Sequence, residues 1–518
     1  MHTRHGTGGA VASADALATA AGVAILRHGG NAVDAAIATN AAIAVTGPHL
    51  CGMGGDLFAL VHHDGAVACL NASGRAASGA DGDALRRAGH TEVPLRHEIG
   101  AVTVPGCVDG WVALHARFGS MPLADVLAPA IGLARGGFPA SALLTRSLQM
   151  VDAQGTQHLA ELATQATETG ATVCRPGVAR TLRAIAEGGR AAFYEGEFGA
   201  GLRALAPAVF AAADLARSQA DWVTPLRSPA WGVELWTVPP NSQGYLLLGA
   251  AGLAERIGLP DDPDDAEWAH LLIECAIAAG YDRPAVLHEG VDGQALLGEV
   301  LVRQSSISRT AASRRAHPAG DGDTTYLCAA DARGMVVSLI QSNASGFGSW
   351  IVEPSTGINL HNRGLGFSLQ PGHPAEMRPG ARPPHTLSPA LATGPSGLVA
   401  ALGTMGGDAQ PQILLQIAAR LFHHGADPGQ AITAGRWALH GPATGFDTWT
   451  APQGPGVLLE GTTPPAWDGA LSALGHRVRR VGPLDSGFGH AHTIVRHPGG
   501  DLAAAADPRT LIGAAEAW

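Results

Sequence analysis

The stretch of sequence that decides the fold is Asp323-Thr324-Thr325-Tyr326-Leu327-Cys328-Ala329-Ala330-Asp331-Ala332-Arg333-Gly334-Met335-Val336-Val337-Ser338-Leu339. Residues 325–330 are largely apolar and run into Asp-Ala-Arg-Gly, which is a good turn signal. Residues 335–340 are apolar and β-branched again, so they predict the return strand of a tight β-hairpin. Thr324 therefore stands at the head of a buried strand, far inside a long chain.

A threonine in this position suits a self-cleaving amidohydrolase. Its hydroxyl can attack the carbonyl of Asp323 and move the chain onto an ester, whose hydrolysis frees a new α-amine beside the same hydroxyl. Such an amine titrates at about 7.7–8.0 in a model peptide, so it can act as the general base for its own nucleophile. Threonine is common in strands, however, and the Thr-Thr pair alone is weak evidence for catalysis.

Short motifs elsewhere in the chain strengthen this hypothesis because they stand in a fixed order. They are Gly29-Gly30-Asn31-Ala32-Val33-Asp34-Ala35-Ala36, Gly47-Pro48-His49, Gly52-Met53-Gly54-Gly55-Asp56, Val104-Pro105-Gly106, Phe118-Gly119-Ser120-Met121-Pro122-Leu123, Leu127-Ala128-Pro129-Ala130-Ile131, Val238-Pro239-Pro240-Asn241-Ser242-Gln243-Gly244, Gly322-Asp323-Thr324-Thr325, Ser388-Pro389 and Gly403-Thr404-Met405-Gly406-Gly407. Together they resemble the gamma-glutamyltransferase family of N-terminal-nucleophile hydrolases over nearly the whole chain. One glycine cluster would mean little, but this many pieces in register are specific.

The resemblance implies an α+β fold, the four-layer αββα sandwich of N-terminal-nucleophile hydrolases. It also implies cleavage between Asp323 and Thr324 into segments 1–323 and 324–518, which would intertwine in one domain and stay associated. Thr324 would be the nucleophile, supported by a hydroxyl on the return strand at the position of Ser342. Thr325 would be structural, because strand alternation turns it to the opposite face.

Gly406 and Gly407 are the candidates for the oxyanion hole. They follow a predicted buried strand at residues 398–403 and precede a predicted helix that carries Ile413, Leu414, Ile417 and Leu421 on one face. A strand-to-helix turn can aim backbone N–H groups, together with the positive end of the helix dipole, at a developing negative charge. The alternative is an ordinary left-handed turn.

The predicted substrate pocket departs from the family pattern. A gamma-glutamyl group carries an α-carboxylate and an α-ammonium, which family members hold with an arginine, an asparagine, an acidic residue and a Ser-Ser pair. The matching positions here are Arg75, Ala344 with Asn343 beside it, Arg363 and Gly366 in the acidic run, and His385-Thr386. The protein has therefore lost the carboxylate that would bind the substrate ammonium, unless Asp408 or Glu353 replaces it. It has also gained positively charged groups. Each of these residues has an alternative role as an ordinary loop residue.

This exchange favours the branch that cleaves small carboxylate-bearing amides, as oxamate amidohydrolases and certain acylases do. We therefore expect an acyl-enzyme on Thr324 that passes its acyl group to water, or less often to another amine. No metal or organic cofactor is implied. Two alternatives stay open: a true gamma-glutamyl hydrolase or transferase that acts on glutathione-like donors, and an uncleaved, inactive relative that serves as a binding protein.

Composition agrees with an enzyme that has a large core. Of the 518 residues 46% are apolar and only 15% are charged, and the net charge is −11. Without a long basic run, nucleic acid is an unexpected partner. The sequence contains no lysine, which excludes a Schiff-base enzyme, a Ser–Lys dyad and a phosphate loop of the Gly-Lys-Ser/Thr type.

The remaining patterns concern thiols, histidines, targeting and local structure. The six cysteines show no Cys-x-x-Cys spacing, so buried free thiols are expected. Histidine pairs such as His62-His63 lack a metal-binding spacing and are interpreted as surface or core residues. The polar start of the chain and the lack of long apolar runs predict a cytoplasmic protein without a membrane span. Further expected elements are a helix from about residue 14 capped by Ser13 or Asp15, a buried helix at 31–46, a hairpin of residues 57–61 and 66–70, a helical layer at 125–225, and a loop at 303–323.

Overall fold

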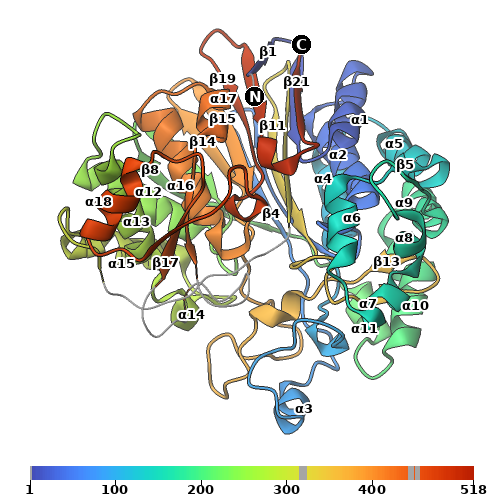
Figure 1. Cartoon of the computed structure of the whole chain (residues 1–518). Coiled ribbons are helices and arrows are strands. Elements are labelled where there is room, and N and C mark those ends of the chain that lie inside the picture. The colour runs from blue at the N-terminus through green and yellow to red at the C-terminus, as the bar shows by residue number, and fades with distance from the viewer. Residues whose placement is uncertain (1–2, 314–323, 441–448, 450–454) are drawn as a thin grey trace.

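Two seven-stranded antiparallel sheets form the centre of the computed structural model, which describes residues 3–313, 324–440, 449 and 455–518 (Figure 1). The first sheet has the strand order β21-β2-β10-β11-β3-β4-β7, and the second has the order β1-β20-β19-β15-β14-β9-β8. The strands of the first sheet are β2 (Gly9–Ser13), β3 (Asp56–His63), β4 (Ala66–Ala72), β7 (Asp221–Val223), β10 (Thr325–Asp331), β11 (Val336–Ser342) and β21 (Ala514–Ala517). Those of the second are β1 (Arg4–Gly6), β8 (Leu226–Ala230), β9 (Val233–Thr237), β14 (Ala390–Gly394), β15 (Gly397–Thr404), β19 (Ala491–Arg496) and β20 (Leu502–Ala506).

Both sheets mix strands from the two sides of Thr324. In the first sheet β10 pairs with β2 on one edge and with β11 on the other, and β11 pairs in turn with β3. In the second sheet β15 and β14 come from the later part of the chain, whereas their neighbours β9 and β8 come from the earlier part. Neither part of the chain can therefore complete a sheet alone.

An apolar layer lies between the two sheets. Tyr326, Cys328 and Ala330 of β10 belong to it together with Leu391, Ala401 and Ile494 of the opposite sheet. The alternate β10 residues Leu327 and Ala329 pack on the other face, among the helices. This period of two is what a strand that is buried on both faces requires.

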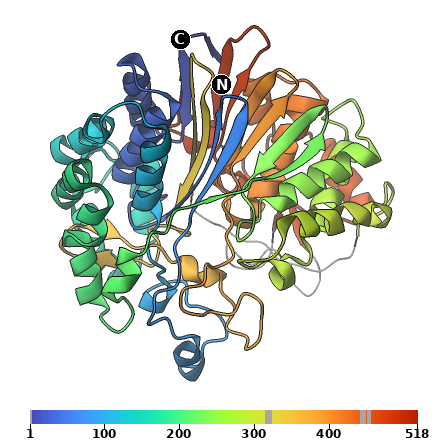
Figure 2. The same ribbon diagram turned by 180° about the vertical axis from the view of Figure 1, so that it is seen from behind.

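Helices cover the outer face of each sheet (Figures 1 and 2). Those on the first sheet's side include α1 (Ala16–Arg27), α2 (Ala32–Thr46), α4 (Cys107–Phe118), α5 (Leu123–Gly136), α6 (Ala142–Gln149), α7 (Ala153–His158), α8 (Ala160–Gln165), α9 (Pro176–Tyr194), α10 (Glu197–Leu205) and α11 (Ala212–Ala216). Those on the second sheet's side include α12 (Tyr245–Ile257), α13 (Ala266–Gly280), α15 (Gly293–Leu301), α16 (Gln410–Ala418), α17 (Pro428–Thr433) and α18 (Ala466–Ala473). The short helices α3 (Gly82–Arg87) and α14 (Arg283–Val286) lie toward the end of the molecule opposite both termini (Figure 1). The predicted α+β class is confirmed.

Three small sheets complete the structure. They are formed by β5 (Phe138–Pro139) with β6 (Thr172–Val173), by β12 (Val352–Glu353) with β13 (Ile358–Asn359), and by β16 (Trp437–His440), β17 (Gly456–Leu459) and β18 (Val478–Arg480). In the last of these, β17 pairs with β18 in parallel.

The predicted cap of the first helix is confirmed. Asp15 caps α1, and its carboxylate accepts a hydrogen bond from the backbone N–H of Leu17 at 2.7 Å. Asn31 caps α2 through a capping box with Asp34, which satisfies backbone donors that the first helical turn leaves unpaired. Every residue of α2 is buried, as its uniformly apolar sequence predicts.

The predicted hairpins are also confirmed. Strands β10 and β11 pair from Thr325 opposite Gln341 to Ala330 opposite Val336, and β3 pairs with β4 around the turn at Asp64 and Gly65. Within the expected helical layer, residues 125–225 also contain the short strands β5, β6 and β7.

Two expected elements differ in detail. The loop expected at 303–323 begins with a 3-10 helix at Val302–Ser306, because a short polar segment can still form i→i+3 bonds. Asp323 and the other residues of 314–323 lie outside the described residues. The helix expected to continue to residue 421 ends as α16 at Ala418 and passes into a five-residue π-helix at Ala419–His423.

All six cysteines are free thiols, as predicted, and all except the half-buried Cys174 are buried. Among the described residues no helix is both long and apolar enough to cross a membrane.

Candidate active site

Thr324 and Ser342 lie side by side at the open end of the β10–β11 hairpin. Thr324 directly precedes β10, Ser342 ends β11, and both side chains are buried. The Thr324 hydroxyl donates a hydrogen bond to Ser342 Oγ at 3.0 Å. Ser342 Oγ also accepts a bond from the backbone N–H of Ala344 at 2.8 Å. The serine is thus held in place from a second direction and can orient the threonine hydroxyl.

Arg363 links this pair to the loop that precedes β14. Its guanidinium donates to Ser342 Oγ at 3.1 Å and to Thr386 Oγ1 at 3.2 Å. Burial lowers the pKa of Arg363 to about 10, against the opposing effect of Asp56, so the group stays protonated at neutral pH. A buried cation therefore lies one hydrogen bond away from the partner of Thr324.

Asp56 is a charged neighbour that the sequence analysis did not assign to the site. It begins β3, directly opposite Ser342 in the sheet register. Its carboxylate accepts a bond from His385 Nε2 at 3.0 Å and from the backbone N–H of Gly74 at 2.8 Å. Burial opposes ionisation, but His361, His385 and Arg363 hold the pKa of Asp56 at about 2. The ionised carboxylate balances the charge of Arg363.

His385 supports Asp56 and does not line the cavity described below. Burial lowers the pKa of His385 to about 3, so the ring is neutral and donates its Nε2–H to the carboxylate. The ring also meets Phe58 edge-on, with centroids 4.8 Å apart. Direct substrate binding by His385 stays a prediction, whereas its neighbour Thr386 contacts Arg363 and lines the cavity.

The turn at Gly406 and Gly407 follows β15 and adopts backbone angles that suit glycine. Their φ values are +135° and +53°, a region in which side chains with a Cβ are strained. Neither N–H donates a hydrogen bond to another described residue. The side chain of Gln243 donates to the Gly407 carbonyl at 3.1 Å and to the Thr386 carbonyl at 3.0 Å. The turn is thereby tied to the loop that contacts Arg363, and the oxyanion role of its amides stays a prediction.

A cavity of about 420 Å³ opens beside Arg363 and Thr386. Three further charged groups on its wall are Glu92, which is exposed, Arg283, from α14, and Asp408, whose Oδ1 lies 3.4 Å from Arg283 Nη2. Gly366 is also part of the wall, where the family pattern places an acidic residue. Asp408 therefore returns one carboxylate to the cavity, paired with an arginine.

Glu353 is placed away from this cavity. Its carboxylate is buried and accepts bonds from the backbone N–H groups of Ser355 and Thr356 at 3.0 and 2.9 Å. Of the two acids considered as replacements for the missing one, only Asp408 lines the cavity.

Two predicted substrate-binding residues are not brought to this cluster. Arg75 donates to Asp221 at 2.7 Å and lies 3.7 Å from Glu289, in a network that it shares with Arg382. The Asn343 side chain donates to the carbonyl of Pro48 at 3.2 Å. Within the described part of the chain, neither side chain contacts Thr324 or Arg363, so their roles in binding stay predictions.

The glycines before β3 pack against the candidate site, as predicted. A Cβ on Gly55 would lie 2.3 Å from the carbonyl oxygen of Ser342, and one on Gly54 would lie 2.2 Å from that of Asn359. Glycine is needed here for close backbone approach, which agrees with a packing role and not with a phosphate-binding loop.

Comparison with known proteins agrees with this arrangement. The family described as Gamma-glutamyltranspeptidase matches residues 18–517. The chain belongs to the gamma-glutamyltranspeptidase family. It is 36% identical to an oxamate amidohydrolase proenzyme of Klebsiella pneumoniae, over 99% of this chain and all of the relative. It is 34% identical to the glutathione hydrolase-like YwrD proenzyme of Bacillus subtilis, over 97% of each chain.

A solved structure supports the same assignment. The cephalosporin acylase from Bacillus halodurans superimposes with a TM-score of 0.90 at 33% identity, covering all of this chain and 97% of the acylase. This protein is accordingly an amidohydrolase or gamma-glutamyltransferase-like enzyme.

Proposed function

We propose that the protein is a self-cleaving threonine amidohydrolase that forms an acyl-enzyme on Thr324. The contact between the Thr324 hydroxyl and Ser342 carries this proposal, because it places a buried, oriented hydroxyl at the head of a strand. On this proposal, the two sheets and their helices are the αββα sandwich of N-terminal-nucleophile hydrolases. The word proenzyme in the names of both relatives supports cleavage before Thr324.

Cleavage would yield segments 1–323 and 324–518, which stay associated since both sheets take strands from each segment. The new α-amine of Thr324 accepts the proton of its own hydroxyl as Oγ1 attacks the amide carbon of the substrate. The N–H groups of Gly406 and Gly407 stabilise the oxyanion that develops. The C–N bond breaks, the protonated amine leaves, and water then hydrolyses the ester on Thr324.

The acyl group that fits this site best carries a carboxylate and no ammonium. Arg363 and Arg283 place two guanidinium groups at the cavity, whose two carboxylates are the buried Asp408, beside Arg283, and the exposed Glu92. A charge-assisted bond to a substrate carboxylate is strong in a partly dry site. The oxamate amidohydrolase and acylase relatives are in keeping with this choice.

A glutathione-like donor is the second candidate. Asp408 could receive the α-ammonium of a gamma-glutamyl group if Arg283 turned away, and one relative is named glutathione hydrolase-like. The third candidate, an unprocessed binding protein, requires that cleavage fails.

Maturation can be tested with a denaturing gel and N-terminal sequencing. We expect two bands from the wild type, the smaller beginning at Thr324, and one band from Thr324→Ala. Thr325→Val is a matched control, because the Thr325 hydroxyl has no hydrogen-bond partner among the described residues and its loss should leave cleavage intact. A single wild-type band, or a fragment that begins elsewhere, would refute self-cleavage at this bond.

Substrate class can be tested with a γ-glutamyl anilide and its glutaryl counterpart, which differ only in the α-ammonium. We expect a higher kcat/KM for the glutaryl compound, since the buried carboxylate of the cavity, that of Asp408, is already paired with Arg283 and the other, that of Glu92, is exposed to solvent. A tenfold or larger preference for the γ-glutamyl compound, about 1.4 kcal/mol, would establish the glutathione-like candidate in its place.

A further inference from the structure

Outside the candidate active site, two histidines and a glutamate converge in the core. His270 and Glu274 lie one turn apart on α13, and His476 lies between α18 and β18. All three are buried, with exposed fractions of 0%, 1% and 8%. One nitrogen from each histidine and one carboxylate oxygen lie within 4.8 Å of one another. Nitrogen and carboxylate donors of this kind are the ligands of zinc in His₂Glu sites.

The two histidines share a hydrogen bond, which an ion bound between them would replace. His270 Nδ1 lies 2.8 Å from His476 Nε2, which lies 4.0 Å from Glu274 Oε1. Zinc bonds of about 2.0–2.1 Å in tetrahedral geometry would separate neighbouring donor atoms by roughly 3.3 Å. To bind zinc, the distance between the two histidine nitrogens would have to increase by about half an ångström, and the distance from His476 to Glu274 would have to decrease by slightly more. Small side-chain rotations can provide both changes.

The surrounding backbone orients two of the three donors. His270 Nε2 lies 2.8 Å from the carbonyl oxygen of Ser308, which can only accept, so this nitrogen carries the proton and Nδ1 keeps its lone pair. The N–H of Ser313 donates to both oxygens of Glu274 at 3.1 Å. A histidine whose second nitrogen donates to a backbone carbonyl is typical of metal sites.

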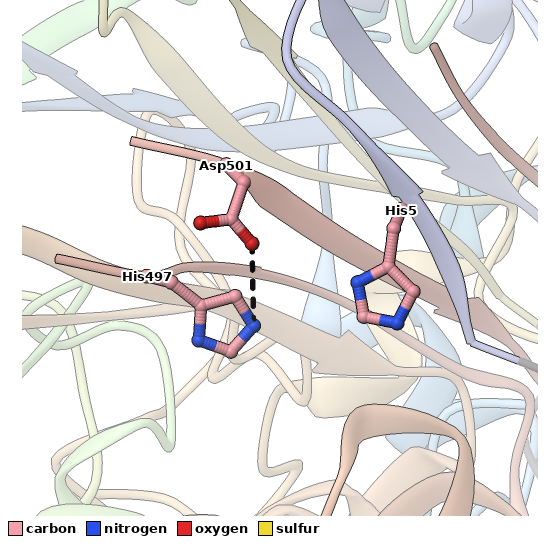
Figure 3. Close-up of side chains that lie close together, drawn as sticks. All are labelled: His5, His497 and Asp501. Atoms are coloured by element: carbon pink, nitrogen blue, oxygen red, sulfur yellow. Dashed lines mark ion pairs between the residues drawn. The ribbon is translucent and has the colours of Figure 1, made fainter. Parts of the chain in front are cut away.

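A second group, His5, His497 and Asp501, lacks these features (Figure 3). His497 Nε2 lies 4.0 Å from Asp501 Oδ2, but both side chains are more than 40% exposed. Within the described part of the chain, no hydrogen bond orients the ring of His5 or His497. This group provides a matched control.

We propose that His270, Glu274 and His476 bind one Zn²⁺ ion, with a fourth position left for water. The ion would lie outside the candidate active site around Thr324. It would join α13 and the loop at His476, and through the contacts of Ser308 and Ser313 it would fix the segment 308–313. The sequence analysis missed this site because His476 is 202 positions from Glu274 along the chain (476 − 274).

The first test uses the purified full-length protein, stripped with EDTA and dialysed. Titration with Zn²⁺ in a calorimeter and elemental analysis after desalting should both give about one ion per chain. The melting temperature should rise with added Zn²⁺ and fall again with excess EDTA, since an ion that binds the folded state stabilises it.

Variants assign the ion to its ligands. Glu274→Gln and His476→Gln should each weaken Zn²⁺ binding by tenfold or more, while His497→Gln should leave it unchanged. Circular dichroism in EDTA checks that each variant is folded, and Glu274→Gln keeps an oxygen for the Ser313 N–H. The proposal is overturned if the wild type binds no Zn²⁺, if folded variants bind as tightly as the wild type, or if only His497→Gln abolishes binding.

Discussion

Arg363 combines a buried charge, hydrogen bonds within the candidate site and a proposed role in substrate specificity. It is buried, donates to Ser342 and Thr386, and is offset by Asp56. The sequence singles it out only because it replaces a neutral residue of the family pattern. The structure adds that the same cation also holds Ser342, the hydrogen-bond partner of Thr324.

Arg363→Ala should therefore raise KM for carboxylate-bearing amides. Loss of a hydrogen bond to a charged group is equivalent to about 1.5–3 kcal/mol, so we expect a rise of roughly tenfold to hundredfold. Self-cleavage should still complete, because it needs no external substrate. Steady-state kinetics with the glutaryl anilide provide the measurement.

Arg75→Met is the control for this prediction. Arg75 is also a buried arginine, but it pairs with Asp221 outside the cavity wall. Its loss should lower the melting temperature and leave KM within about twofold, the ordinary scatter of a remote change. If Arg75→Met raises KM as much as Arg363→Ala does, Arg75 binds the substrate as first predicted and the cavity has been assigned too narrowly.

Among the elements, the strand-to-helix turn after β15 has the most specific requirement. Gly406 and Gly407 have positive φ angles and leave their N–H groups without a described partner. Gly407→Val should distort the turn and reduce turnover by about 10²–10³-fold if one oxyanion donor is displaced. Turnover of a processed, folded sample is the measurement, with folding checked by thermal melting.

Gly425→Val separates loss of an oxyanion donor from backbone strain. Gly425 has a φ of +76°, and nothing lies within 4 Å of an added Cβ, so the strain is comparable and the site is remote. We expect reduced stability with near-normal turnover. Normal turnover in a folded Gly407→Val enzyme would exclude the oxyanion role.

The elements that the sequence predicts well have local determinants. The β10–β11 hairpin and the Asp15 cap depend on residues within a few positions of one another. The change from α16 to the π-helix could not be predicted, because the apolar period continues through both segments as far as Leu421. The strand-to-helix turn at Gly406-Gly407 is predicted only in part. The sequence pattern predicts where the turn lies but not the direction in which its backbone N–H groups point.

Across the whole molecule, the sequence could not reveal partners that meet through long-range packing. Arg75 and Asp221, which are hydrogen-bonded, are 146 positions apart in the sequence. Asp56 and His385 are also hydrogen-bonded and are 329 positions apart. The motifs indicated that Asp56 lies near the core. Its position opposite Ser342 is apparent only from the sheet register. Such contacts set the charges of the site, which is why its electrostatics could be predicted less well than the pairing of Thr324 with Ser342.

Buried neutral histidines make the stability of the whole fold depend on pH. Burial lowers the pKa of His49, His385 and His492 to about 3 and that of His490 to about 4, from an ordinary value of 6.5. Between about pH 6.5 and 4 the unfolded chain binds protons at these positions and the folded chain does not. The stabilisation is therefore complete above pH 6.5 and is lost as the pH falls through this window.

The melting temperature, measured in EDTA, should consequently be highest near neutral pH and fall by at least several degrees between pH 7 and 5. Asp56, whose pKa is lowered to about 2, adds a further loss only below its ordinary value of 3.8. His492→Gln should make the melting temperature depend less steeply on pH, because it removes one buried titrating ring. His424→Gln, at an exposed position, should leave this pH dependence unchanged. If the melting temperature stays constant or rises toward pH 5, these histidines are already protonated in the folded protein. The Asp56 carboxylate would then form an ion pair with His385 as well as balancing the charge of Arg363.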